Sequence, residues 1–211
     1  MPEYSINPSY AASFLAKAEE VTRLIRMDQS QKLDEAILIL FEAWKQNRPI
    51  FIMGNGGSAS TATHLASDLA KTICSSPEDR GLRALALSDN IPLVSATTND
   101  WGWENLYTGQ LATYYEPGGV GIAFSVHGGA GRDLSGAWSQ NILKGLQYIK
   151  DHGGKTIGFS GFDGGAMKNL VDISLLVPAE STPIVEGLHV VLHHLLVFGL
   201  KQKIQEYKKP S

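Results

Sequence analysis

The sequence predicts an α/β protein with a doubly wound, mainly parallel sheet. Three observations favour this fold class. Apolar runs typical of buried strands alternate with segments in which apolar residues recur at helical spacing. A glycine-rich turn follows one of these runs and leads into a helix. At 211 residues, with 43% hydrophobic and 18% charged residues, the chain is long enough for one domain with a full core.

Two helices are expected over residues 1–48. Pro8 is typical of a first helical turn, and apolar residues recur at helical spacing from Phe14 to Ile25. The second helix, over 31–46, has an apolar face so broad that we expect both of its sides to be buried. We expect this helical pair and an α/β core over 49–211 to form a single domain.

A strand, a turn and a helix are expected between Phe51 and Leu69. The apolar run 51–53 precedes Gly54, and Ser58 is placed to cap a helix that starts near Ala59. A helix N-terminus carries partial positive charge and free N–H groups, which suit a phosphate. The residues expected to bind the anion are Asn55, Gly56, Gly57 and Ser58. A plain strand-to-helix connection is the alternative.

Four further strands are expected over 82–87, 120–125, 155–159 and 172–177, with helices between them and a last helix over 183–206. Ligands of such sheets bind beyond the carboxyl ends of the strands. Gly54, the pair Asn99 and Asp100, and Ser125 all follow strands or lie in their loops. We therefore expect them to converge on one crevice.

Charge and composition exclude several classes of function. A net charge of -3 gives no basic footprint for nucleic acid, and the single Cys74 rules out an internal disulfide. The polar start MPEYSINPSY lacks the features of a secretory signal, so we expect a cytoplasmic protein. The apolar stretch 188–200 is too short to span a bilayer, which predicts a buried helix and no membrane contact.

His64 and Asp68 stand four residues apart, so they share one face of the helix that follows the glycine turn. A solvated histidine beside a helical carboxylate is the simple interpretation. However, the motif GNGGSxxxAxH from Gly54 to His64, followed by an acidic residue four positions later, resembles the signature of the sugar isomerase (SIS) domain of phosphoheptose isomerases. The resemblance covers nearly the whole chain.

The resemblance implies further substrate-binding residues. Asn99 and Asp100 match a segment that contacts substrate; a turn flanked by two core or interface tryptophans is the alternative. A second phosphate loop follows the strand 120–125, where the matching hydroxyls are Ser125, Ser135 and Ser139. Here the sequence departs from the family by an insertion of roughly ten residues within 126–138. Arg132 in this insertion either adds a charge to the site or belongs to a solvated flap.

The resemblance also implies the reaction. It is an aldose-ketose isomerisation of a phosphosugar, sedoheptulose 7-phosphate in the family, with Asp68 and His193 as the proton-transfer pair. Asp68 replaces the family's glutamate. His64, Asp68 and His193 match zinc ligands, but Val185 stands where a glutamine completes the set, so we expect any zinc to be weakly held. Glu186, His189 and His193 share a helical face and form an alternative metal set.

The resemblance further implies a homotetramer with the N-terminal helices at the interface. A non-catalytic SIS protein that binds a phosphosugar or acts as an adaptor is the rival function, and an isomerase of another phosphosugar, such as glucosamine phosphate, is a third.

Overall fold

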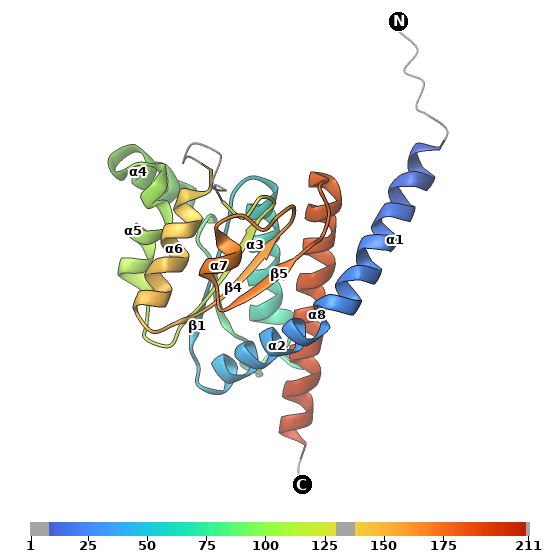
Figure 1. The fold of residues 1–211 in the computed structure, drawn as a ribbon. Coiled ribbons are helices and arrows are strands. Elements are labelled where there is room, and N and C mark those ends of the chain that lie inside the picture. Colours follow the sequence, from blue (N-terminus) through green and yellow to red (C-terminus); the bar gives the residue numbers. More distant parts are fainter. Residues whose placement is uncertain (1–8, 130–137, 210–211) are drawn as a thin grey trace, which may run out of the picture.

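The computed structural model describes residues 9–129 and 138–209, and it confirms the predicted fold class. Five parallel strands form one sheet in the order β2-β1-β3-β4-β5, with helices on both faces (Figure 1). The strands are β1 (Pro49–Gly54), β2 (Arg83–Ala86), β3 (Val120–Ser125), β4 (Lys155–Ser160) and β5 (Ile173–Leu176). The sequence therefore predicted every strand of this sheet to within a few residues.

The helical elements alternate with these strands. They are α1 (Tyr10–Asp28), α2 (Ser30–Lys45), α3 (Gly57–Ser67), α4 (Ile91–Trp101), α5 (Leu106–Tyr114), α6 (Gln140–Asp151), α7 (Met167–Leu170) and α8 (Thr182–Lys208). A π-helical segment, η1 (Asp68–Thr72), continues α3, and a 3-10 turn, η2 (Trp103–Asn105), precedes α5. The expected helix start at Pro8 lies outside the described residues.

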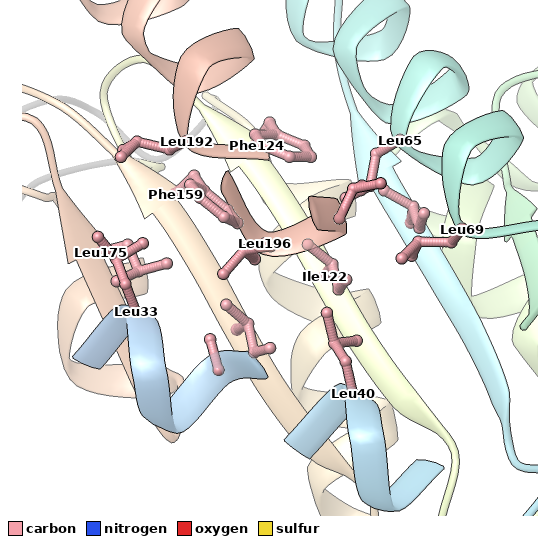
Figure 2. Packing of buried hydrophobic residues seen from close by; sticks show 14 of the residues in the cluster. Leu33, Leu40, Leu65, Leu69, Ile122, Phe124, Phe159, Leu175, Leu192 and Leu196 are labelled. Atoms are coloured by element: carbon pink, nitrogen blue, oxygen red, sulfur yellow. The ribbon is translucent and has the colours of Figure 1, made fainter. Parts of the chain in front are cut away.

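Side chains of β1 divide between two hydrophobic cores, because successive residues of a strand point to opposite faces of the sheet. Ile50 and Ile52 join a core formed with α1, α2, α3 and α8, part of which is shown in Figure 2. Phe51 and Met53 face a second core formed with α5, α6 and α7. Helices thus cover both faces, and the crevice beyond the carboxyl ends of the strands is left for ligands.

The N-terminal helices are less covered than the sequence predicts. α2 packs against α8 and β5, whereas α1 extends away from the body of the protein (Figure 1). Val21 and Ile25 are the buried residues of α1. Within one chain the apolar face of α2 is covered on one side, because Leu40 is buried whereas Ile37 and Ile39 are half-buried and Leu38 is exposed. Burial of the other side against a second subunit stays a prediction.

α8 is longer than the apolar stretch 188–200. Among the described helices it is the one long and apolar enough to cross a membrane, but half of its most apolar window is buried inside the fold. Leu192, Leu196 and Leu200 on this helix are buried in the core. The expectation that this segment is too short to span a bilayer is wrong in length, because the helix continues beyond residues 188–200. The expected burial is found on one face of α8, while Val191, Leu195 and Phe198 are exposed in the single chain.

His189 on α8 is a histidine inside the hydrophobic core. It is buried, and its ring centroid lies 5.7 Å from that of Phe124 and 6.0 Å from that of Phe159. Burial lowers the pKa of His189 from 6.5 to about 4, because desolvation penalises the charged imidazolium. The folded protein therefore keeps this side chain neutral at pH 7.

We expect His189 to make the fold sensitive to acid. Below about pH 6.5 the unfolded chain binds a proton at His189 that the folded protein does not, so stability falls progressively down to about pH 4. Between pH 7 and pH 5 this single group should remove about 2 kcal/mol from the free energy of unfolding. Urea unfolding of wild type and His189→Leu at both pH values measures the effect. If the free energy of unfolding depends on pH equally in the two proteins, the prediction is contradicted.

Candidate active site

A cleft of about 360 Å³ lies at the carboxyl ends of β1 and β3, where the order of the strands along the sheet reverses. Its lining residues are Asn55, Ser58, Trp103, Phe124, Ser125, Val126, His127, Trp138, Ser139, Ile142 and Glu186. Four of the predicted substrate-binding residues, Asn55, Ser58, Ser125 and Ser139, therefore come together here. Trp103, His127 and Trp138 also line the cleft and were not predicted from the sequence.

The glycine turn brings the end of β1 against the first turn of α3. A Cβ on Gly54 would lie 2.3 Å from the carbonyl oxygen of Ser58, so this position requires glycine. Gly56 has φ 57° and ψ -126°, which a side chain would strain, and it is the N-cap residue of α3. The prediction that Ser58 caps a helix from Ala59 is wrong, because α3 already begins at Gly57.

Asn55 joins the two loops of the cleft. Its carboxamide forms two reciprocal hydrogen bonds with that of Asn141 in α6, of 3.0 and 2.9 Å. The Tyr107 hydroxyl donates a 2.5 Å hydrogen bond to the carbonyl oxygen of Gly54. Burial raises the pKa of Tyr107 to about 12, so the hydroxyl stays protonated. The hydrogen bonds between Asn55 and Asn141 therefore fix the glycine turn relative to the start of α6, and the hydrogen bond from Tyr107 holds the end of β1.

The second loop presents two hydroxyl groups. The Oγ atoms of Ser125 and Ser139 lie 3.4 Å apart, and Ser125 Oγ accepts a 3.2 Å hydrogen bond from the backbone N–H of Gly128. The His127 ring packs against Phe162, with ring centroids 4.2 Å apart, and against Trp138 at 5.4 Å. Ser135 and Arg132 lie outside the described residues, so the rest of the predicted insertion is not placed.

Asn99 and Asp100 do not lie in a loop after a strand. They belong to the last turn of α4 and are exposed, and Asn99 Nδ2 donates a 2.7 Å hydrogen bond to Asp100 Oδ1. The helix extends this far because the side chain of Asn90 caps its start and Gly102, with φ 85°, ends it. Among the described residues of this segment, Trp103 lines the cleft and the Asn-Asp pair does not.

A cluster of titratable side chains joins α3 to α8. The Nε2 atoms of His64, His193 and His194 lie 3.5, 3.7 and 3.5 Å from Oδ2 of Asp68. One ligand atom from each of these four residues lies within 4.8 Å of the others. The His193 side chain is fully buried, whereas those of His64 and His194 are 48% and 40% exposed. Asp68 and His193, distant in sequence, are thus side by side.

The surroundings of Asp68 and His193 determine their positions and the protonation of His193. Asp68 is the first residue of the π-helical segment η1, and such segments are frequent at functional sites. Its Oδ1 accepts a 2.9 Å hydrogen bond from the Thr72 hydroxyl. Burial lowers the pKa of His193 to about 4, and the neighbouring His194 and His64 lower it as well, against an opposing effect of Asp68. The His193 imidazole is therefore neutral at pH 7.

Val185, Glu186 and His189, the other residues of α8 considered from the sequence, lie outside the cluster around Asp68. Val185 is fully buried, and a Cβ on Gly161 would lie 2.4 Å from one of its methyl groups. Glu186 lines the cleft, with its carboxylate beside Gly57, and His189 lies in the core. The alternative metal set of Glu186, His189 and His193 is therefore wrong; in the part of the chain that the structure describes, the cluster on Asp68 is the group close enough to share an ion.

The cleft and the cluster lie on the same two helices. Ser58 and Asp68 belong to α3 and its continuation, and Glu186 and His193 belong to α8. His64 follows Ser58 by less than two helical turns, about 9 Å along the helix axis. A ligand of extended shape is needed to contact both.

Comparisons with known proteins agree with this architecture. The SIS domain family matches residues 13–161. The phosphoheptose isomerase of Geotalea daltonii is 32% identical over 186 residues, which cover 88% of this chain and 91% of that protein. The lincomycin biosynthesis protein LmbN of Streptomyces lincolnensis is 41% identical over 163 residues, or 75% of this chain, but the match spans only 58% of LmbN.

Solved structures show the same fold. A phosphoheptose isomerase from Francisella tularensis superposes with a TM-score of 0.84 at 21% identity, over 94% of this chain and 100% of that one. Together with the glycine turn, the switch-point cleft and the matched length of the curated relatives, these findings place the chain in the SIS-domain family of phosphoheptose isomerases.

Proposed function

We propose that this protein is an isomerase that interconverts the ketose and aldose forms of a phosphosugar, with sedoheptulose 7-phosphate as its substrate. One observation carries the proposal. Asp68 and His193 come from distant segments of the chain, and Nε2 of His193 lies 3.7 Å from Oδ2 of Asp68. Relatives of nearly the same length are phosphoheptose isomerases. An aldose-ketose isomerisation needs such a pair of proton-transfer groups close together.

The cleft supports binding of the phosphate end of the sugar. Ser139 is the N-cap residue of α6, and the hydroxyl of Ser125 at the end of β3 lies beside it. A helix N-terminus favours an anion. The carboxylate of Glu186 lies beside Gly57 at the start of α3 and disfavours a second negative charge there. In place of the anion site expected at the glycine turn, we therefore propose that the phosphate binds toward Ser125 and Ser139. Sugar hydroxyls then lie toward Asn55, Gly56, Gly57 and Ser58. Asn99 and Asp100 would contact substrate only after a local rearrangement.

The distance between cleft and cluster favours a long, open-chain sugar. If the phosphate binds in the cleft near Ser139, the carbons next to the carbonyl must reach Asp68 and His193. These residues follow Ser58 and Glu186 of the cleft by ten and seven residues, or about three and two helical turns. There one group removes the proton from the carbon beside the carbonyl and the other donates a proton to the oxygen. The phosphate anchor holds the sugar in place for both transfers. A seven-carbon phosphosugar meets this requirement better than a triose phosphate.

In the second form of this proposal, Asp68 and His193 are not the proton-transfer pair but ligands, with His64, of a zinc ion. Among the described residues, the buried Asp68 Oδ2 and both ring nitrogens of His193 have no hydrogen-bond partner, although buried polar atoms are normally satisfied. Neutral imidazole and carboxylate are ordinary zinc ligands. A bound zinc ion would polarise a sugar oxygen as a Lewis acid.

Proton NMR of sedoheptulose 7-phosphate with the purified protein tests the function. Growth of aldose signals is the expected result. The rival function, a non-catalytic phosphosugar-binding or adaptor protein, predicts saturable binding without new signals, and that outcome would overturn the proposal. Sugar phosphates of shorter chain length test the length of the substrate separately. Titration should show that they bind in the cleft, and the NMR assay should show that they turn over slowly.

We further propose that the protein is a cytoplasmic homotetramer that binds neither membranes nor nucleic acid. The apolar side chains Val191, Leu195 and Phe198 follow one face of α8 and are exposed in the single chain, as are Leu15 and Met27 on α1. Such contiguous apolar faces commonly mark protein interfaces. The face on α8 adjoins His194, so a second copy would also shield the cluster from water.

Phe198→Glu should split this assembly, because it replaces the largest apolar side chain of the exposed face of α8 by a charge. We expect light scattering to give a mass several times that of one chain for the wild type and a smaller mass for the variant. Asn169→Asp on α7 adds a negative charge beyond the opposite face of the sheet and should leave the mass unchanged. A wild type that is monomeric at all concentrations would contradict the proposal.

A further inference from the structure

We propose that His194 is a fourth metal ligand, so that one chain holds a divalent transition metal ion through three imidazoles and one carboxylate. His193 is the ligand of α8 that the family resemblance implies, and the implied set is incomplete because Val185 cannot coordinate. The structure brings the next residue of α8 to the same carboxylate. Its Nε2 lies 3.5 Å from Asp68 Oδ2, slightly closer than the 3.7 Å of His193.

The arrangement around Asp68 accounts for two adjacent histidines in one site. Successive residues of a helix point about 100° apart, so they normally face different surroundings. Here His193 is buried between α8 and α3, while His194 lies at the edge of the same contact. The ring centroids of His193 and His194 are 4.2 Å apart, and the His64 centroid lies 4.6 Å from the first and 4.9 Å from the second. The three rings surround one oxygen atom.

The separations match a shared ion better than hydrogen bonds. The three Nε2 atoms lie 3.5 to 3.7 Å from Asp68 Oδ2, which is beyond ordinary hydrogen-bond distance. Four ligands placed tetrahedrally at zinc–ligand distances near 2 Å lie about 3.3 Å from one another. The residues with exposed side chains, His64 and His194, are also the ones free to make the small adjustment that coordination requires.

The donor set indicates which metals would bind. Imidazole nitrogens favour zinc, cobalt, nickel and copper, whereas magnesium, calcium and manganese prefer sites made mainly of oxygen. Three nitrogens and one oxygen suit a tetrahedral zinc site. His194 therefore replaces a missing oxygen ligand by a nitrogen, which should strengthen rather than weaken selectivity for zinc.

Metal titration of the purified, chelator-treated protein tests the ligand role without reference to turnover. We expect one Co²⁺ per chain, with the intense visible absorption of four-coordinate Co²⁺, and displacement of this band by Zn²⁺. Magnesium should not compete. His194→Ala should bind Co²⁺ about tenfold or more weakly and lose most of the band intensity, because one of four ligands is removed.

Two further variants make the result specific. His152→Ala removes an exposed histidine at the end of α6 and should keep wild-type affinity and spectrum. His194→Asp restores a ligand and should recover binding with a shifted band, which a purely structural role of His194 does not predict. Equal affinity and spectrum for wild type and His194→Ala would overturn the proposal, as would a wild type that binds no Co²⁺ or Zn²⁺. Either result leaves the isomerase assay to decide the function independently.

Discussion

Asp68→Asn should reduce turnover of sedoheptulose 7-phosphate by about a hundredfold or more while phosphosugar affinity stays within several fold. The substitution keeps the size of the side chain and the acceptor atom for the Thr72 hydroxyl, which donates to Asp68 Oδ1 at 2.9 Å. It removes the negative charge and the basicity that proton transfer or metal coordination needs. Binding should persist because the proposed phosphate contacts, Ser125 and Ser139, are on other elements.

His193→Ala should have an effect of similar size, because its imidazole faces the same carboxylate. If the two side chains act as one unit, the double variant should lose little more than either single variant. Independent roles would instead multiply the two losses. Kinetic measurements of kcat and KM for the three variants separate these cases.

Asp28→Asn is the matched control for the charge change, because Asp28 is exposed at the end of α1. It should keep wild-type turnover. Undiminished turnover in a folded Asp68→Asn protein would show that Asp68 is not part of the reaction. In that case Glu186, whose carboxylate lines the cleft, would be the next group to test.

The fold could be predicted from the sequence because its central strands are covered on both faces. Such strands appear as continuous apolar runs between turn residues, as β1 and β3 do. The extent of α4 could not be predicted in the same way. Asn99 and Asp100 favour turns by their own chemistry, and the helix includes them only because its ends are set by Asn90 and Gly102.

Residue spacing alone predicts the site only where residues close in sequence carry it, whereas the family resemblance was needed to predict His193 beside Asp68. One strand-turn-helix segment contains the glycine turn, His64 and Asp68. Their spacing alone therefore predicts that His64 and Asp68 share one face of the helix after the turn. The pairing of Asn55 with Asn141 and the approach of His194 to Asp68 depend on contacts between distant segments. Trp138 was missed because its position depends on how the inserted loop returns to α6.

Gly54→Ala should lower the free energy of unfolding by about 3 kcal/mol, near the upper end of overpacking effects. The added Cβ would lie 2.3 Å from the Ser58 oxygen, 2.5 Å from the Ser58 carbonyl carbon and 2.9 Å from the Ala59 nitrogen. All three are backbone atoms, so no side-chain rotation can relieve the clash. β1 and α3 must separate, which also displaces Asn55 and widens the cleft.

Urea unfolding of Gly54→Ala and Gly187→Ala measures this effect against a matched control. Gly187 lies in α8 and is exposed, and a Cβ there would meet nothing within 4 Å, so alanine should be neutral or stabilise the helix by up to about 1 kcal/mol. Because typical domains are stable by only about 5 to 15 kcal/mol, the Gly54 variant should unfold at clearly lower urea. If both variants unfold at the wild-type midpoint, β1 does not approach the first turn of α3 this closely. The position of Asn55 and Ser58 in the proposed phosphosugar cleft would then be wrong as well.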